Sequence, residues 1–214
     1  MVDFVLDQGP YAEAVRIPVR PFTLVGATTR KGALSLRLRE RFRLNLQLEF
    51  YAIADLSLIV RRSAGFLSMR LDLEAAEKIA RRSRGTPPIA SRLLRIVRDF
   101  AQVYRVENIG SNLVNEALEL EGVDVLGLDD LDRRYLRTLI GHFQGGPAGV
   151  AALAASMQED IDTLEDVVEP YLLYEGFCLR TPNGRQATPK AYHHLRLRPP
   201  GRESDQQPLP IDED

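Results

Sequence analysis

The stretch "GFCLRTPNGRQAT", from Gly176 to Thr188, is the part of the chain that indicates a fold most directly. Two short runs suited to β-strands flank Pro182-Asn183-Gly184, and an Asn-Gly pair is a strong signal for a tight turn. One arginine lies on each side of this turn, Arg180 and Arg185. We therefore expect a β-hairpin with a guanidinium group on each strand.

Three predicted helices precede this hairpin, near residues 129–143, 148–156 and 159–174, because apolar residues recur there with the helical period. Three helices followed by a hairpin form the pattern of a winged helix. A wing of this kind can lie against the DNA backbone or in the minor groove, where arginine is a common contact. Solvated turn arginines with no ligand are the alternative for Arg180 and Arg185.

A helical bundle is expected between the N-terminal region and the winged helix. The period of 3.6 predicts helices near 52–67, 72–84, 88–104 and 111–121. The third of these has Thr86 as its N-cap and prolines at its first two helical positions, where their missing N–H groups cost nothing.

Residues 1–50 have the pattern of β-strands, with one short helix from about Ser35 to Phe42. "FTLVGA" is a short apolar run of the buried-strand type, and "RLNLQLEF" alternates strictly between apolar and polar residues. The expected fold class is therefore α/β followed by a mainly α region.

Two features of this N-terminal region suit a nucleotide site. Thr28 follows the predicted strand "FTLVGA", and in nucleoside-triphosphatase sheets a polar residue there lies near the γ-phosphate. Capping of the next turn is the alternative for Thr28. Arg39 and Arg41 project about 200° apart on a helix, so one of them could reach the phosphates of a neighbouring subunit as an arginine finger.

The motifs that hold ATP and magnesium in P-loop enzymes are missing from the sequence. It contains no G-x-x-x-x-G-K-[ST] loop and no apolar strand ending in Asp-Glu. We therefore expect that a chain of this sequence does not bind and hydrolyse ATP by itself in the usual manner.

Composition sets wider limits. The 214 residues are 44% hydrophobic and 27% charged, as in an ordinary globular protein, and no apolar run reaches the roughly 18 residues that span a membrane. The N-terminus resembles neither a signal nor a transit peptide, so a cytoplasmic location is expected. With one cysteine, Cys178, and three histidines without ligand spacing, we expect no metal site. The net charge of −2 means that DNA binding would require local basic clusters.

Several long segments follow one another as in the RuvB family, the AAA+ motors that drive branch migration of Holliday junctions. They are "PFTLVGATTRKGALSLRLRERF", "ARRSRGTPPIASRLLRIVRDFAQV", "FQGGPAGVAALAASM" and "EDVVEPYLLYEGFCLRTPNGRQAT". The resemblance implies the C-terminal part of an AAA+ ATPase core at 1–50, a helical lid at 51–124 and a winged-helix DNA-binding domain at 125–198. The Pro-rich, acidic remainder, 199–214, is expected to be disordered.

The resemblance also implies roles for single residues. Thr28 falls at sensor 1, Arg41 at the arginine finger, and Tyr51 near the adenine of ATP, which the family binds with Mg²⁺. Arg180 and Arg185 fall on the DNA-facing wing. The strands at 1–20 resemble a shortened form of the hairpin that contacts RuvA, and the family assembles as homo-oligomeric rings on DNA during recombination and repair.

The sequence departs from the family pattern at two positions and at its start. Pro88 stands where the family has the sensor 2 arginine, and Asn183 stands where the wing tip usually has an arginine. The family's Walker A and Walker B segments lie upstream of the segment that matches Met1, so we expect a truncated RuvB-like subunit without autonomous ATPase activity. A non-catalytic DNA-binding or adaptor protein and a decayed gene fragment are the alternatives.

Overall fold

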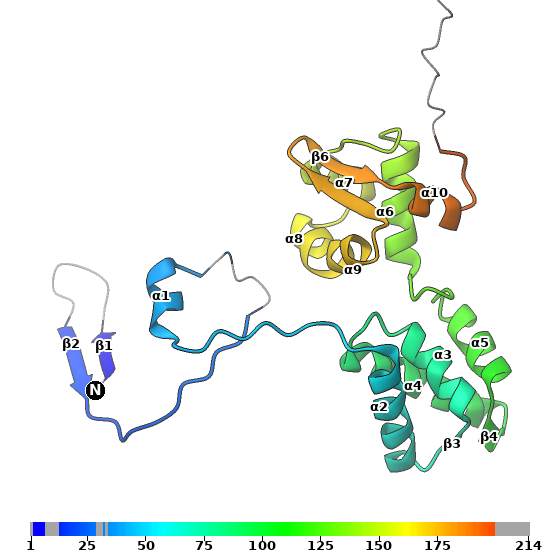
Figure 1. The fold of residues 1–214 in the computed structure, drawn as a ribbon, viewed down its shortest axis with the longest axis horizontal. Coiled ribbons are helices and arrows are strands. Elements are labelled where there is room, and N and C mark those ends of the chain that lie inside the picture. The colour runs from blue at the N-terminus through cyan, green and yellow to red at the C-terminus, as the bar shows by residue number, and fades with distance from the viewer. Residues whose placement is uncertain (1, 7–12, 29–31, 33, 200–214) are drawn as a thin grey trace, which may run out of the picture. The chain divides into compact units, whose positions relative to one another are not determined.

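The computed structural model describes residues 2–6, 13–28, 32 and 34–199. The chain divides into two compact units, Met1–Leu48 and Glu49–Asp214, and each is described by itself (Figure 1). Except for residue 199, the tail that the sequence predicts to be disordered lies outside the described residues, as do Thr29 and Arg30.

The N-terminal unit contains one strand pair and one short helix. Strand β1 (Val2–Leu6) pairs with β2 (Glu13–Ile17) in an antiparallel register that places Val2 opposite Ile17. Helix α1 (Leu36–Arg41) begins after Ser35, whose side-chain oxygen accepts a hydrogen bond from the Leu38 N–H at 3.3 Å. The predicted short helix is therefore confirmed, with an N-cap that satisfies one of its free amides.

The strands predicted at 22–27 and 43–50 are not formed. Both runs lack regular secondary structure and have no strand partner among the described residues, and their apolar side chains are exposed, including Val25 at 85% and Leu48 at 93%. Alternation in the sequence indicates a face that can be buried, but a strand also needs a neighbouring backbone to satisfy its amides and carbonyls. The described part of this chain does not provide one.

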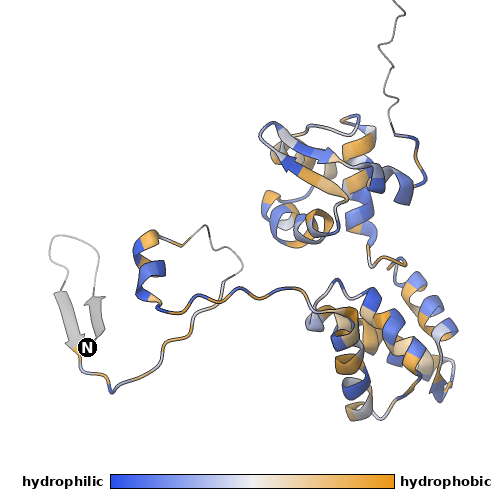
Figure 2. Cartoon of the chain, viewed as in Figure 1, coloured by the Kyte–Doolittle hydropathy of each residue, from blue (hydrophilic) through white to orange (hydrophobic). Residues whose placement is uncertain are grey.

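The second unit begins with the four predicted helices of the bundle: α2 (Ile53–Phe66), α3 (Leu73–Arg81), α4 (Pro87–Val103) and α5 (Ser111–Leu120). A two-residue parallel pair, β3 (Arg70–Leu71) with β4 (Asn108–Ile109), joins the loops before α3 and α5. Hydrophilic and hydrophobic residues share each helix (Figure 2), and the apolar ones meet in a core that includes Leu56, Val60, Ile79, Leu93, Val97, Val114 and Leu118.

Helix α3 ends three residues earlier than the sequence predicts. After Arg81 the Ser83 hydroxyl donates to the Ile79 carbonyl at 2.5 Å, and the next two residues have positive φ angles, 50° at Arg84 and 67° at Gly85. Left-handed residues end a helix because they turn the following amide away from the helix axis. The turn that results, 83–86, leads directly into α4.

The winged-helix part contains the expected three helices and hairpin. Helices α6 (Asp130–Gly141) and α7 (Val150–Met157) precede a third helical segment, α8 (Ile161–Thr163), η2 (Leu164–Val168) and α9 (Glu169–Tyr174), and strands β5 (Cys178–Thr181) and β6 (Gly184–Ala187) form the hairpin. Helix α10 (Pro189–His194) was not predicted. The π-helical turn η2 ends two residues before Pro170, which has no N–H for a regular helical bond.

The hairpin turn depends on the glycine of its Asn-Gly pair. Gly184 has a φ of 133°, and a Cβ added there would lie 2.5 Å from the Ala148 carbonyl oxygen. That close approach belongs to a β-bridge between Ala148 and Arg185, which fastens the hairpin to the segment before α7. The buried core beneath includes Tyr135, Leu136, Leu139, Leu153, Leu164, Val168 and Phe177.

No helix in the described part of the chain is long and apolar enough to cross a membrane.

Candidate nucleotide-site segment and nucleic-acid interface

Thr28 and Arg41, the two predicted catalytic residues, lie in the N-terminal unit. Both are exposed, and Arg41 is the last residue of α1. A Cβ added to Gly26 would lie 3.2 Å from the ring of Phe42, so the segment that carries Thr28 passes close to the C-terminal end of α1. Arg39, by contrast, is partly buried. Of the two arginine-finger candidates, Arg39 and Arg41, Arg41 is therefore the more accessible to a second molecule.

Tyr51, the predicted adenine contact, lies beside the turn that starts α4. Its backbone N–H donates to the Gly85 carbonyl at 2.9 Å, while its side chain remains 49% exposed. A side chain at Gly85 would collide with Phe50, because an added Cβ would lie 2.6 Å from the Phe50 Cβ. Close packing thus joins Tyr51 to the turn before Pro88, and Pro88 itself is exposed.

Arg180 and Arg185 lie directly opposite each other in the β5–β6 register and extend toward the same acidic pair. Arg185 Nε donates to Glu169 Oε1 at 2.8 Å, and its terminal nitrogen donates to Glu165 Oε1 at 2.6 Å. Arg180 Nε donates to Glu169 Oε2 at 3.0 Å. Directly opposed residues of an antiparallel pair share one face, so the wing presents both guanidinium groups to the third helical segment.

The two arginines differ in how much of each remains for a ligand. The Arg185 side chain is 12% exposed and the Arg180 side chain is 49% exposed. The geometry therefore makes Arg185 mainly a structural partner of the acidic pair, whereas half of Arg180 remains open to solvent. A DNA contact by either residue stays a prediction.

Glu169 is fully buried at the centre of this cluster. Burial opposes its ionisation, but hydrogen bonds from Arg185 and Arg180 outweigh burial and lower the pKa of the carboxyl. The Tyr135 hydroxyl donates to the same carboxylate at 3.0 Å. Nearby, burial raises the pKa of the Cys178 thiol to about 12, so this cysteine is an inert member of the core.

The sequence interpretation missed the acidic pair. Glu165 and Glu169 are four residues apart, a spacing that places side chains on one helix face. That signal was available, but it did not indicate that the partners would come from a hairpin up to 20 residues later.

The residues of this chain fit only part of an ATP–Mg²⁺ site. Tyr51 offers an exposed aromatic ring, and Pro88 offers no guanidinium or backbone N–H to a phosphate. Within the described ranges, no group of three or more His, Cys, Asp or Glu side chains could hold a metal ion. The described residues therefore do not fit a complete ATP–Mg²⁺ site.

Three family models match the chain in succession. The model of the Holliday junction DNA helicase RuvB P-loop domain matches residues 1–48, that of the RuvB AAA lid domain matches 51–124, and that of the RuvB C-terminal winged helix domain matches 125–196. The chain belongs to the RuvB family. Its fold is accordingly a mostly helical C-terminal AAA+ part with a lid and a winged helix.

Solved RuvB structures agree with this assignment. The Thermotoga maritima RuvB Holliday junction branch migration motor is 48% identical, with a TM-score of 0.82 over 85% of this chain and 61% of that one. A single-substitution variant of the same protein gives 48% identity and a TM-score of 0.83 over 86% of this chain and 62% of that one. The chain thus spans about three fifths of the length of the RuvB structures that it matches.

Proposed function

We propose that this chain works in DNA recombination and repair as a RuvB-type subunit of a cytoplasmic Holliday junction branch-migration assembly. The observation that carries the proposal is its 48% identity, over 85% of its length, to a structure described as a branch migration motor. In this proposal residues 1–50 belong to an AAA+ core, 51–124 form the lid, and 125–198 bind four-way junction or duplex DNA. A homo-oligomeric ring and a RuvA-like partner, contacted through the strands at 1–20, complete the assembly.

The nucleotide roles divide between subunits. Arg41, exposed at the end of α1, acts on the ATP of a neighbouring subunit, Thr28 acts as the sensor 1 residue, and Tyr51 contacts adenine. The sequence contains no phosphate-binding loop with a Gly-Lys-Ser/Thr ending. We therefore expect a polypeptide of this sequence to show no ATP turnover by itself.

DNA binding by the wing is tested best by a gain of function, because a gain cannot arise from misfolding. Asn183 is exposed at the wing tip, and Asn183→Arg should raise duplex affinity and steepen the salt dependence by about one phosphate contact. Asn112→Arg, an equally added charge on an exposed position of α5, is the control. Arg180→Gln should weaken binding. Equal effects of Asn183→Arg and Asn112→Arg would remove the wing from the proposal.

A DNA-binding or adaptor protein without motor function is the second candidate. The observation that favours it is Pro88, which is exposed at the start of α4 where the family has a phosphate-sensing arginine. This candidate shares the DNA binding of residues 125–198 but predicts that Arg41 is dispensable. The experiment that separates the two is therefore an assay of Arg41 in a mixed ring.

A further inference from the structure

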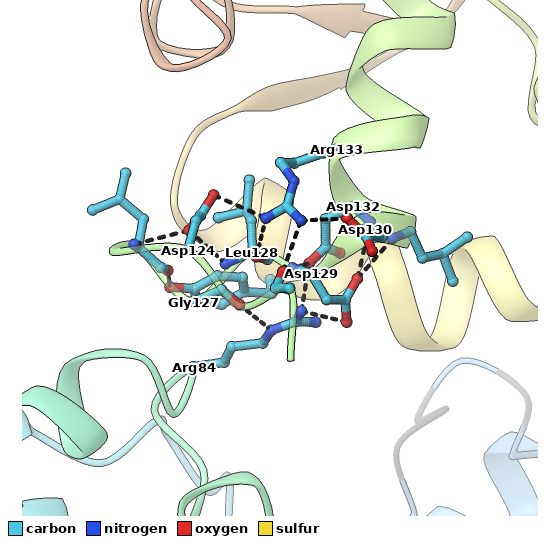
Figure 3. Close-up of polar contacts among 12 residues, drawn as sticks. Arg84, Asp124, Gly127, Leu128, Asp129, Asp130, Asp132 and Arg133 are labelled. Carbon is cyan, nitrogen blue, oxygen red and sulfur yellow. Dashed lines mark hydrogen bonds and ion pairs between the residues drawn. The ribbon is translucent and has the colours of Figure 1, made fainter. Parts of the chain in front are cut away.

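The Arg84 side chain extends from the lid and contacts the first residues of the winged-helix domain (Figure 3). Its Nε donates to the Gly127 carbonyl at 2.8 Å, and one terminal nitrogen donates to Asp129 Oδ2 at 2.7 Å and to Asp132 Oδ2 at 2.5 Å. The Arg84 side chain is 8% exposed and that of Asp132 is 1% exposed, so their contact is shielded from water, whereas Asp129 is 35% exposed. A buried guanidinium with three acceptors on another domain is a specific connection rather than a surface ion pair.

The receiving carboxylates are already fixed by helix α6. Asp129 Oδ1 accepts from the N–H groups of Leu131 at 3.0 Å and Asp132 at 3.1 Å, and Asp132 Oδ2 accepts from the Asp129 N–H at 3.0 Å. This reciprocal capping box holds both side chains in place. Arg84 therefore binds a preformed site at the helix N-terminus, and its position is transmitted to α6 as a whole.

The chain between the two domains is closely packed as well. Gly127 has a φ of 79°, and a Cβ added there would lie 2.6 Å from the Arg82 carbonyl oxygen. From the winged-helix side, the Tyr171 hydroxyl donates to the Leu126 carbonyl at 2.7 Å. The connecting turn thus has contacts from both domains and cannot serve as a free linker while they persist.

The turn that carries Arg84 also contacts Tyr51, the predicted adenine-binding residue. Gly85, the next residue, accepts the Tyr51 N–H, and α4 begins two residues later at Pro87. Any displacement of this turn relative to Tyr51 moves the Arg84 backbone. The Arg84 side chain extends from this position into the winged helix.

We propose that Arg84 is a positioning residue that fastens the lid to the winged helix, so that a movement of the 83–86 turn reaches the wing instead of being absorbed by the connection. The fastening itself does not depend on the proposed function. Its use in a motor, to couple a nucleotide-driven change to DNA, rests on that function.

The test measures the distance between the two domains in the full chain. Spin labels on Arg61→Cys in α2 and Asn183→Cys at the wing tip occupy exposed positions, and the native Cys178 is fully buried. Pulsed electron paramagnetic resonance then reports the distance distribution. The labelled parent chain is compared with its Arg84→Gln variant, and both are measured without ATP or DNA.

The matched control is Arg81→Gln at the last residue of α3, three residues before Arg84, where the arginine forms a surface ion pair with Glu77. We expect one narrow distance peak for the parent chain and for Arg81→Gln, and loss of that peak for Arg84→Gln with the helical circular dichroism unchanged. A narrow peak for Arg84→Gln, or a broad distribution for the parent chain, would overturn the proposal.

If Arg84→Gln fails to fold, Arg84→Lys decides the question. It keeps the charge beside Asp129 and Asp132 but loses the planar fork that reaches three acceptors. A broadened distribution supports the fastening, and an unchanged one contradicts it. Because neither outcome involves DNA or ATP, failure here is distinguishable from failure of the proposed function.

Discussion

Glu169 shows how much a single buried charge can determine in this protein. Its carboxylate has no exposed surface and accepts hydrogen bonds from Tyr135, Arg180 and Arg185. Glu169→Gln keeps the volume but turns one acceptor into a donor that faces a guanidinium group. Since breaking one side of a buried ion pair typically costs about 3–5 kcal/mol, we expect strong destabilisation of the wing. Hydrogen exchange of the amides at 178–187 measures it.

Glu165→Gln is the control for that substitution. Glu165 binds the same Arg185, but its side chain is 35% exposed, and loss of so accessible a pair should cost at most about 1 kcal/mol. The lowered pKa of Glu169 also predicts that its contribution is present near neutral pH and is lost as the pH falls through the folded-state pKa. Equal protection of the hairpin in the two variants would contradict the central role of Glu169.

Asp132 should have the opposite pH dependence. The pKa of its carboxyl is raised from 3.8 to about 7, mainly because burial disfavours the charged form. The charge of Arg84 lowers this pKa, and the charge of Asp129 raises it. Between these two values the folded protein holds a proton that the unfolded chain has released. The free energy of unfolding therefore falls as the pH rises through this window, by at most about 1.4 kcal/mol per pH unit.

The measurement is the difference in urea stability between the parent chain and Asp132→Asn across this window. As the pH rises, the free energy of unfolding of Asp132→Asn should increase relative to that of the parent chain, because asparagine carries no charge to desolvate. Asp130→Asn, at an acid whose side chain is 89% exposed, should leave the slope of the parent chain intact. A flat difference for Asp132→Asn would show that the carboxylate is already ionised at acidic pH.

The identity of the wing residues could be predicted at this scale, but not their partners. A turn signal fixes Arg180 and Arg185 on opposite sides of Gly184 because the constraint is local. Their pairing with Glu169 depends on how the third helical segment packs under the hairpin, which no short-range pattern specifies. The same reason explains why Arg84 was missed: its acceptors lie 43 to 48 residues away.

At the scale of elements, the apolar runs without strand partners create an exposed edge. Leu46 and Leu48 are 77% and 93% exposed in a segment whose sequence alternates between apolar and polar residues. Such segments can pair with another chain, and a lysine placed there blocks pairing by its charge. We expect Leu46→Lys with Leu48→Lys to reduce self-association of the full chain, measured by sedimentation velocity.

Leu120→Lys is the matched control for the edge. Leu120 is 78% exposed, as much as Leu46, but it lies at the end of helix α5, where the backbone is already hydrogen-bonded. A lysine there removes a similar apolar surface without blocking a strand edge. If it reduces association as much as the pair at 46 and 48, general hydrophobic contact rather than strand pairing is responsible.

The contrast between helices and strands explains which elements could be predicted. Helices α2, α4, α5, α6 and α7 were predicted to within a few residues, because the helical period and the caps are contained in the segment itself. The strands at 22–27 and 43–50 were predicted from the same kind of pattern and are absent, since a strand requires a partner from elsewhere. The β5–β6 hairpin was predicted correctly because its two strands are adjacent in sequence.

At the scale of the whole molecule, the proposed roles fall into two groups with different needs. Wing contacts and the Arg84 connection require only residues of the second unit, Glu49–Asp214. The role of Arg41 requires another subunit, because an arginine finger acts on a phosphate that its own chain does not hold. The motor function and the DNA-binding function can therefore be separated in one experiment.

That experiment mixes the chain with a complete RuvB subunit whose own arginine finger has been removed. An arginine finger contributes on the order of 10³–10⁵ in rate, so incorporation of this chain should restore ATP hydrolysis by the complete subunits. Arg41→Ala should abolish the rescue, whereas Arg37→Ala, at an exposed arginine of the same helix, should retain it. The chain by itself should show no turnover. Rescue that survives Arg41→Ala, or no rescue despite ring formation seen by mass photometry, would leave DNA binding as the function supported by this structure.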